Sequence, residues 1–146
     1  MLYKIKEVEF KYKNKVTDVT IFHDPEDIFK WFKNLQDETQ EKFISIYLDC
    51  MNQVIAYSVD FVGGINTALI DPKVLMRNAL IMGSVGIIFL HNHPSGSNEP
   101  SVQDITLYNR LDRMLKSIDL KIVDFVIIGN TYYSFKENGL LQVTPA

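Results

Sequence analysis

His91 and His93, followed by Asp104, are the residues of this sequence best suited to chemistry. Zinc binds histidine nitrogen and aspartate oxygen in tetrahedral sites, and a catalytic zinc site keeps three protein ligands with a fourth position open. On such a site the expected chemistry is metal-assisted hydrolysis through a zinc-activated water. The three residues therefore predict a zinc site with His91, His93 and Asp104 as its ligands.

The elements predicted around these residues can bring them together. Residues 85–90 are apolar at nearly every position, which predicts a central strand covered on both faces. His91 and His93 follow that strand, and residues two apart in extended backbone point to the same face. A helix is predicted over residues 101–118, with Asp104 on its apolar stripe. The carboxylate should therefore face the sheet, where a buried charge needs a partner.

Each of these residues could also have a purely structural role. A single histidine beside a strand is often a hydrogen-bonded core residue. Ser101 and Asp104 fit a helix capping box, with Asp in place of the usual Glu. Other hydrolytic sites fit less well. The single Cys50 excludes the cysteine pair of zinc deaminases, and the chain has neither an H-E-x-x-H helix nor a G-x-S-x-G motif.

The order of predicted elements indicates an α/β (α+β) fold, a mixed β-sheet flanked by helices, in a single domain over residues 1–146. Asp24-Pro25 and Asp71-Pro72 each predict a helix that starts with an N-cap and a proline. The inward faces expected for these helices are Ile28, Phe29, Phe32 and Leu35, and Leu75, Met76, Ala79 and Leu80. Besides residues 85–90, strands are expected over residues 2–12, 19–22, 43–48, 54–62, 67–70, 120–128 and 132–135.

Composition narrows the class of protein and its partners. The chain has 146 residues, of which 47% are hydrophobic and 23% charged, which is typical of a globular domain. With no signal peptide, no membrane-length apolar run and one cysteine, a cytoplasmic protein without membrane contact is expected. The net charge of -3 argues against a broad nucleic-acid surface. The run of lysines from Lys4 to Lys15 favours a solvated edge strand, with nucleic-acid contact as the weaker alternative.

On these motifs the sequence resembles the JAB/MPN (JAMM) metalloprotein superfamily, and within it the bacterial RadC-like proteins. The resemblance covers residues 23–141. Its specific matches are His91-Asn92-His93-Pro94-Ser95-Gly96, Glu99-Pro100-Ser101 and Asp104, and its weaker ones are Tyr47-Leu48-Asp49, Gly63 with Ile65-Asn66, and Gly129 ahead of Ser134-Phe135 and Gly139-Leu140-Leu141.

The resemblance implies a mixed sheet between helices, with a cytidine-deaminase-like outline. It implies zinc on His91, His93 and Asp104, and a role for Ser101 in stabilising the tetrahedral intermediate. The implied activity is hydrolysis of peptide or isopeptide bonds, and the name of the RadC-like branch records a proposed link to DNA repair.

Three departures from the family pattern bear on activity. The family's general base is a glutamate on a strand well before the histidines, and counting back from Gly63 puts Ser58 at its position. The nearest carboxylate is Asp60, about 6.6 Å further along a regular strand, and it is kept as a candidate base. The family's Asp-His pair in a late buried strand is Asp124-Phe125 here. The helix-hairpin-helix of full-length members is expected to be absent.

Two functions follow from this pattern. The first is a zinc-dependent metallopeptidase or isopeptidase, with His91, His93 and Asp104 on the metal, Ser101 at the oxyanion and Asp60 as the candidate base. The second is a catalytically weak or silent zinc-binding JAB module, acting in protein interactions or in DNA repair, which Ser58 favours. Sequence alone leaves the peptide or protein substrate and the oligomeric state open.

Overall fold

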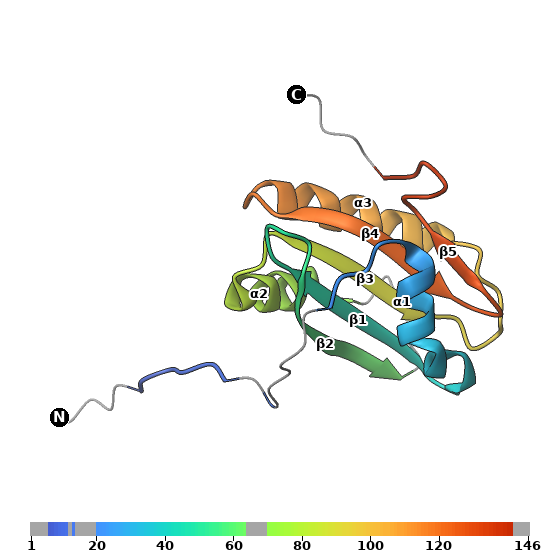
Figure 1. Ribbon diagram of the computed structural model, residues 1–146, viewed down its shortest axis with the longest axis horizontal. Helices are drawn as coiled ribbons and strands as arrows, with labels where there is room; N and C mark the ends of the chain where they lie inside the picture. Colours follow the sequence, from blue (N-terminus) through green and yellow to red (C-terminus); the bar gives the residue numbers. More distant parts are fainter. Residues whose placement is uncertain (1–5, 12, 14–19, 64–69, 142–146) are drawn as a thin grey trace.

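A computed structural model describes residues 6–11, 13, 20–63 and 70–141 of the chain. Along the chain (Figure 1) it forms α1 (Pro25–Trp31), the 3-10 helix η1 (Lys33–Asp37), β1 (Glu41–Leu48), β2 (Val54–Gly63), α2 (Pro72–Met82), β3 (Gly86–Asn92), α3 (Val102–Lys116), β4 (Lys121–Ile128) and β5 (Tyr132–Ser134).

The strands form one sheet of five strands in the order β2-β1-β3-β4-β5. The pair β3–β4 is parallel, while the pairs β1–β2, β1–β3 and β4–β5 are antiparallel. The predicted mixed sheet flanked by helices is therefore confirmed. In this order β3 is the central strand, as expected from its apolar composition, and all seven of its residues are buried.

Helices cover both faces of the sheet, so the core has two parts. Helices α2 and α3 pack on one face, where Leu75 and Leu111 meet Phe43 and Phe89. Helix α1 and η1 pack on the other face (Figure 1), where their inward residues meet alternate residues of the same strands, including Ile44 and Leu90. Odd-numbered residues of β1 and β3 thus face α2 and α3, and even-numbered ones face α1.

The two Asp-Pro signals are confirmed as helix starts. Asp24 caps α1 by accepting a hydrogen bond from the backbone N–H of Asp27, and Asp71 caps α2 in the same way with the N–H of Lys73. The expected inward face of α2 is wrong at Leu80, whose side chain is 58% exposed. Leu80 follows the fully buried Ala79, and one residue further around a helix, about 100°, passes the edge of the contact stripe.

Several predicted strands fall partly outside the described residues. Residues 6–11 are exposed and form no strand, so the strand predicted over residues 2–12 is wrong for that part. Near residues 19–22 the pairing is short: Ile21 forms an isolated bridge with Gln53. The strand predicted over residues 67–70 lies outside the described residues except for Ile70, which is not in a strand. Among the helices of the described ranges, none is long and apolar enough to cross a membrane.

Candidate metal centre

The two histidines lie where β3 ends, on the face covered by α3. His91 is buried, and its ring packs against the ring of Phe43, its partner residue on β1. The rings of His91 and His93 lie 4.8 Å apart, centroid to centroid. The Nδ1 atom of His93 lies 2.8 Å from the carbonyl oxygen of Ser97. Because a carbonyl only accepts, Nδ1 carries the proton, which leaves Nε2 of the neutral ring free to bind a metal.

Asp104 reaches the same place from the first turn of α3. As predicted from the helix stripe, its side chain is fully buried. The capping box is also present: Asp104 Oδ2 accepts from the backbone N–H of Ser101 at 2.8 Å, and Ser101 Oγ accepts from the N–H of Asp104 at 3.0 Å. The cap therefore orients the carboxylate towards the histidines rather than competing with them.

The three side chains form a group that could hold a metal ion. His91 Nε2 lies 2.9 Å from Asp104 Oδ1, and His93 Nε2 lies 3.3 Å from Asp104 Oδ2. One ligand atom from each residue lies within 4.8 Å of the others. Two ligands of a tetrahedral zinc are about 3.3 Å apart, given metal–ligand bonds of about 2.0–2.1 Å. The three side chains are therefore close enough together to hold a divalent metal after small adjustments.

Unpaired atoms in the cluster point to the same kind of site. His91 Nε2 and Asp104 Oδ1 are buried, and within the described part of the chain neither has a hydrogen-bond partner. Although 2.9 Å apart, they are not aligned for an N–H···O bond. Native proteins leave few buried polar atoms unpaired, and a bound ion can satisfy atoms that no hydrogen bond reaches. The donor set therefore fits a divalent cation.

Electrostatics make the cluster attractive to positive charge. Burial by itself would raise the pKa of Asp104, but His91, His93 and the backbone N–H of Ser101 hold that pKa well below its ordinary value. The neighbouring Asp104 carboxylate raises the pKa of His93, against the effect of its burial. Asp104 is thus an ionised carboxylate that stabilises a cation beside it, as a metal ligand must.

Glu41 is the carboxylate that the sequence interpretation missed. It opens β1 two residues before Phe43, so both residues share a face, and Phe43 pairs with His91. Burial raises the pKa of Glu41 and Asp104 adds to that rise, while His91 and His93 act against it, so that the pKa lies above its ordinary value. Glu41 therefore lies at the histidine end of β1, on the sheet face that carries His91.

A signal for Glu41 was available in the sequence. The alternation along residues 41–48 puts Glu41 on the same face as Phe43 and Tyr47. The family's base is a glutamate on a strand well before the histidines, and Glu41 fits that description as well as the position of Ser58 does. To decide between positions 41 and 58, one must know which strand pairs with the strand that carries the histidines, and in which register.

Ser58 and Asp60 lie elsewhere, between β1, β2 and α2. Asp60 Oδ2 accepts from Ser45 Oγ at 2.6 Å, while Oδ1 accepts from Ser58 Oγ at 2.7 Å and from the amide of Asn78 at 2.9 Å. The Ser58 hydroxyl also lies 2.6 Å from that of Tyr47. The β1–β2 register skips Asp60, which forms a bulge, and the bulge turns its carboxylate towards α2.

The half-buried position of Asp60 predicts how stability depends on pH. Burial raises the pKa of Asp60, against the hydrogen bonds from Ser45, Ser58 and Asn78. The folded state therefore favours the protonated acid. Its contribution to stability is full below the ordinary pKa of 3.8 and is lost as pH rises through the folded pKa.

Asp60→Asn removes the charge and keeps one acceptor oxygen. Relative to the wild type, this variant should therefore gain stability between pH 4 and pH 7 in urea unfolding. Asp60→Ala leaves three donors without an acceptor and should cost about 1–3 kcal/mol at either pH. An Asp60→Asn variant that loses stability relative to the wild type as the pH rises would contradict this assignment.

The Asp124-Phe125 pair divides between the two faces of β4. Phe125, where the family has a histidine, is fully buried and packs edge-on against His91, with ring centroids 5.9 Å apart. Asp124 accepts hydrogen bonds from Ser134 Oγ at 2.6 Å and from the N–H of Lys136 at 3.0 Å. Asp124 therefore holds β5 and the turn after it, while Phe125 packs against His91, a candidate metal ligand.

The loop between β3 and α3 is held against the turn after β4. Asn130 N–H donates to the Gly96 carbonyl at 2.7 Å, and a Cβ on Gly129 would lie only 2.4 Å from that same oxygen, so only glycine fits there. At the end of this loop, the Ser101 hydroxyl accepts the N–H of Asp104 at 3.0 Å.

Comparison with known proteins shows which family the chain belongs to. Residues 22–140 match the RadC-like JAB domain. The chain is similar to a UPF0758 protein of Methanosarcina acetivorans, with 33% identity over 120 residues that cover 81% of this chain and 52% of the relative. It is 36% identical over 126 residues to the UPF0758 protein BH3032 of Halalkalibacterium halodurans, which covers 85% of this chain and 54% of the relative.

A shorter relative has a higher identity. The UPF0758 protein YkfG of Escherichia coli is 41% identical over 103 residues, which cover 70% of this chain and 65% of YkfG. The chain thus spans between about half and two thirds of the length of these curated relatives. The resemblance drawn from its histidine motif is confirmed: this chain belongs to the RadC-like JAB family.

Proposed function

We propose that this protein is a zinc-dependent hydrolase of peptide or isopeptide bonds, with Glu41 as its general base. The observation that carries the proposal is the register of β1, which starts at Glu41 and pairs Phe43, two residues further on, with His91 of the His91, His93 and Asp104 cluster. Zinc held by that cluster would supply Lewis-acid chemistry: it would lower the pKa of a bound water to about 7 and polarise the carbonyl of the substrate.

Glu41 has the properties required of a general base. Its carboxylate accepts the proton of the attacking water and returns it to the leaving nitrogen, a role for which a pKa above the usual value is favourable. Burial supplies that rise in its pKa. Asp60 lacks this role in the proposal because Ser45, Ser58 and Asn78 occupy both of its oxygens.

Ser101 completes the proposed site. Its Oγ accepts the N–H of Asp104, so its hydroxyl hydrogen points away from that bond. A donor in that position would stabilise the negative oxygen of a tetrahedral intermediate, where a single such donor is typically worth about 10²–10³ in rate. The cap at the start of α3 would then position both a metal ligand and an oxyanion donor.

The alternative is a zinc-binding module without activity. Ser58 favours this alternative, because a serine at the position of the family's glutamate has no carboxylate to act as a general base. The three-ligand set and the nearby Glu41 support the hydrolase over this alternative, since a structural zinc site is closed by four protein ligands and has no open position for a base to serve. A link to DNA repair has only the name of the RadC-like branch in its favour.

Metal removal tests the proposal directly. Protein stripped with a chelator is expected to hydrolyse neither a mixed peptide library nor lysine-isopeptide-linked peptides, and added Zn²⁺ should restore cleavage. His93→Ala, which removes one ligand, should stay inactive at the same zinc concentration. Product amines are measured by fluorescence labelling. A zinc-loaded wild type that cleaves none of these substrates would support the silent module instead.

A further inference from the structure

Asn92 lies between the two metal-binding histidines but faces the opposite side of the sheet. Its side chain is fully buried. It follows Ile88 and Leu90 on the face of β3 that packs under α1, whereas His91 and His93 face α3. One stretch of three residues therefore supplies two candidate metal ligands on one face and a buried carboxamide on the other.

The carboxamide of Asn92 binds the backbone on both sides of Glu41. Its Oδ1 accepts from the N–H of Lys42 at 2.7 Å, and its Nδ2 donates to the carbonyl of Gln40 at 3.1 Å. A further bond runs from Nδ2 to the carbonyl of Leu35 in η1, at 3.2 Å. Three of the four hydrogen-bonding positions of the amide are thus used, all for backbone groups in η1 and at the start of β1.

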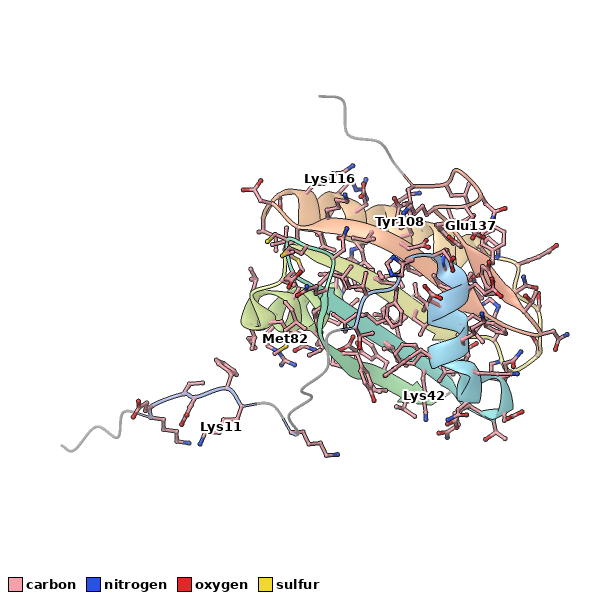
Figure 2. The ribbon with its side chains drawn as sticks, viewed as in Figure 1. Lys11, Lys42, Met82, Tyr108, Lys116 and Glu137 are labelled. Carbon is pink, nitrogen blue, oxygen red and sulfur yellow. The ribbon has the colours of Figure 1, made fainter. Side chains whose placement is uncertain are left out.

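These bonds continue the connection between β1 and β3 where the strand pairing stops. The paired residues end at Phe43 and His91. Beyond them, Asn92 links β3 to the peptide groups that flank Glu41. Figure 2 shows Lys42, one of the two flanking residues, at the end of the sheet where β1 begins, next to η1. The backbone of Glu41 is therefore held from the same stretch that carries the histidines.

From these contacts we propose that Asn92 is a positioning residue, which fixes Glu41 relative to the metal ligands through the peptide groups of Gln40 and Lys42. This inference rests on the proposed role of Glu41 as the base. An amide suits the position because it must both accept and donate, whereas a carboxylate only accepts and an aliphatic side chain does neither. Reacting groups are sensitive to such placement, since a shift of about 1 Å can cost about 100-fold in rate.

If Asn92 had only a structural role, a different result would be expected. Removing its amide would then lower the stability of the fold, but it would not selectively change the position of Glu41. The test therefore compares Asn92→Ala and the milder Asn92→Ser with Ser134→Ala. Ser134 is equally buried and hydrogen-bonded, but it lies on β5, on the far side of β3 and β4 from β1.

The decisive measurement uses Co²⁺, a paramagnetic ion, in protein with ¹³C-labelled glutamate carboxylates. In the wild type, Co²⁺ should broaden the Glu41 resonance. Asn92→Ala and Asn92→Ser should bind Co²⁺ within about threefold of the wild-type affinity, because the ligands remain. Their Glu41 resonance should be broadened less. Ser134→Ala should keep the wild-type broadening.

Kinetics supply the second readout where the wild type is active. Asn92→Ala should lower kcat by about 10- to 100-fold, with KM within about threefold. Added to Glu41→Gln, it should change kcat by less than about twofold, because residues that act as a unit are not additive. The inference is overturned if the Glu41 broadening is unchanged in both Asn92 variants, or if Ser134→Ala reduces it equally. The NMR readout needs no substrate, so an inactive wild type would reject the proposed function without deciding the role of Asn92.

Discussion

Replacing Asp104 by asparagine is expected to abolish the thermal stabilisation that Zn²⁺ gives this protein while leaving α3 capped. The carbonyl oxygen of asparagine can still accept the N–H of Ser101, which Asp104 Oδ2 binds at 2.8 Å. The negative charge that attracts a cation to His91 and His93 is lost, however, and a neutral amide is a poor ligand for zinc. The variant therefore separates the two roles of Asp104.

The expected size of this effect follows from binding linkage. Zn²⁺ at about 100 times its dissociation constant stabilises the folded state by about 2.7 kcal/mol, which raises the melting temperature of a domain of this size by roughly 5–10 °C. Differential scanning calorimetry with and without Zn²⁺ should show this rise in the wild type and none in Asp104→Asn.

The matched control removes the other half of the capping box. Ser101→Ala loses the acceptor for the Asp104 N–H, which should cost about 1 kcal/mol of stability. Because Asp104 and both histidines remain, this variant should keep the full rise with Zn²⁺. The metal assignment would be wrong if Asp104→Asn kept the zinc-dependent rise.

The Glu41→Gln variant is expected to bind zinc as the wild type does but to lose most of its hydrolytic activity. Gln is close to Glu in shape but cannot accept a proton from water at neutral pH. Loss of a general base typically lowers the rate by about 10²- to 10⁴-fold. Zinc binding, measured by calorimetric titration, should stay within about threefold of the wild type, since His91, His93 and Asp104 complete a three-ligand site.

Asp60→Asn is the control that decides between the two carboxylates. The described side-chain hydrogen bonds of Asp60 are made with Ser45, Ser58 and Asn78. The rate of hydrolysis should therefore stay within about twofold of the wild type, as is usual for a substitution away from the reacting groups. The assignment of the base to Glu41 would be refuted if Asp60→Asn lost hydrolysis and Glu41→Gln kept it.

Much of the site could be predicted from the sequence because its signals are local. The apolar composition of residues 86–90 indicated a central strand, and the spacing of His91 and His93 placed both rings on one face. Asp104 could be placed on the inward face of α3 from its position on the helix stripe. Each of these inferences needs only the direction of a side chain from its own element.

The identity of the fourth charged group depended on the tertiary structure. Asp60 and Glu41 both lie on strands before the histidines, and the sequence interpretation kept Asp60 as its candidate base, with Ser58 at the family position. The antiparallel register of β1 with β3 pairs Phe43 with His91 and so puts Glu41 at the histidine end of the sheet, while a bulge at Asp60 turns that residue towards α2. Register is a property of a pair of strands, and spacing within one strand does not determine which residues of another it meets.

The contacts of Asn92 show the same limit. In the sequence it is the residue between two histidines, with no sign of a role of its own. Its bonds reach Gln40 and Lys42, 52 and 50 positions earlier in the chain, because the end of β3 meets the start of β1. The three candidate metal ligands and the elements that carry them could be predicted from the sequence, because each depends on the periodicity of one strand or one helix. The pairing of β1 with β3 and the bonds of Asn92 to the start of β1 became visible only in the tertiary structure, because such contacts join segments far apart in the chain.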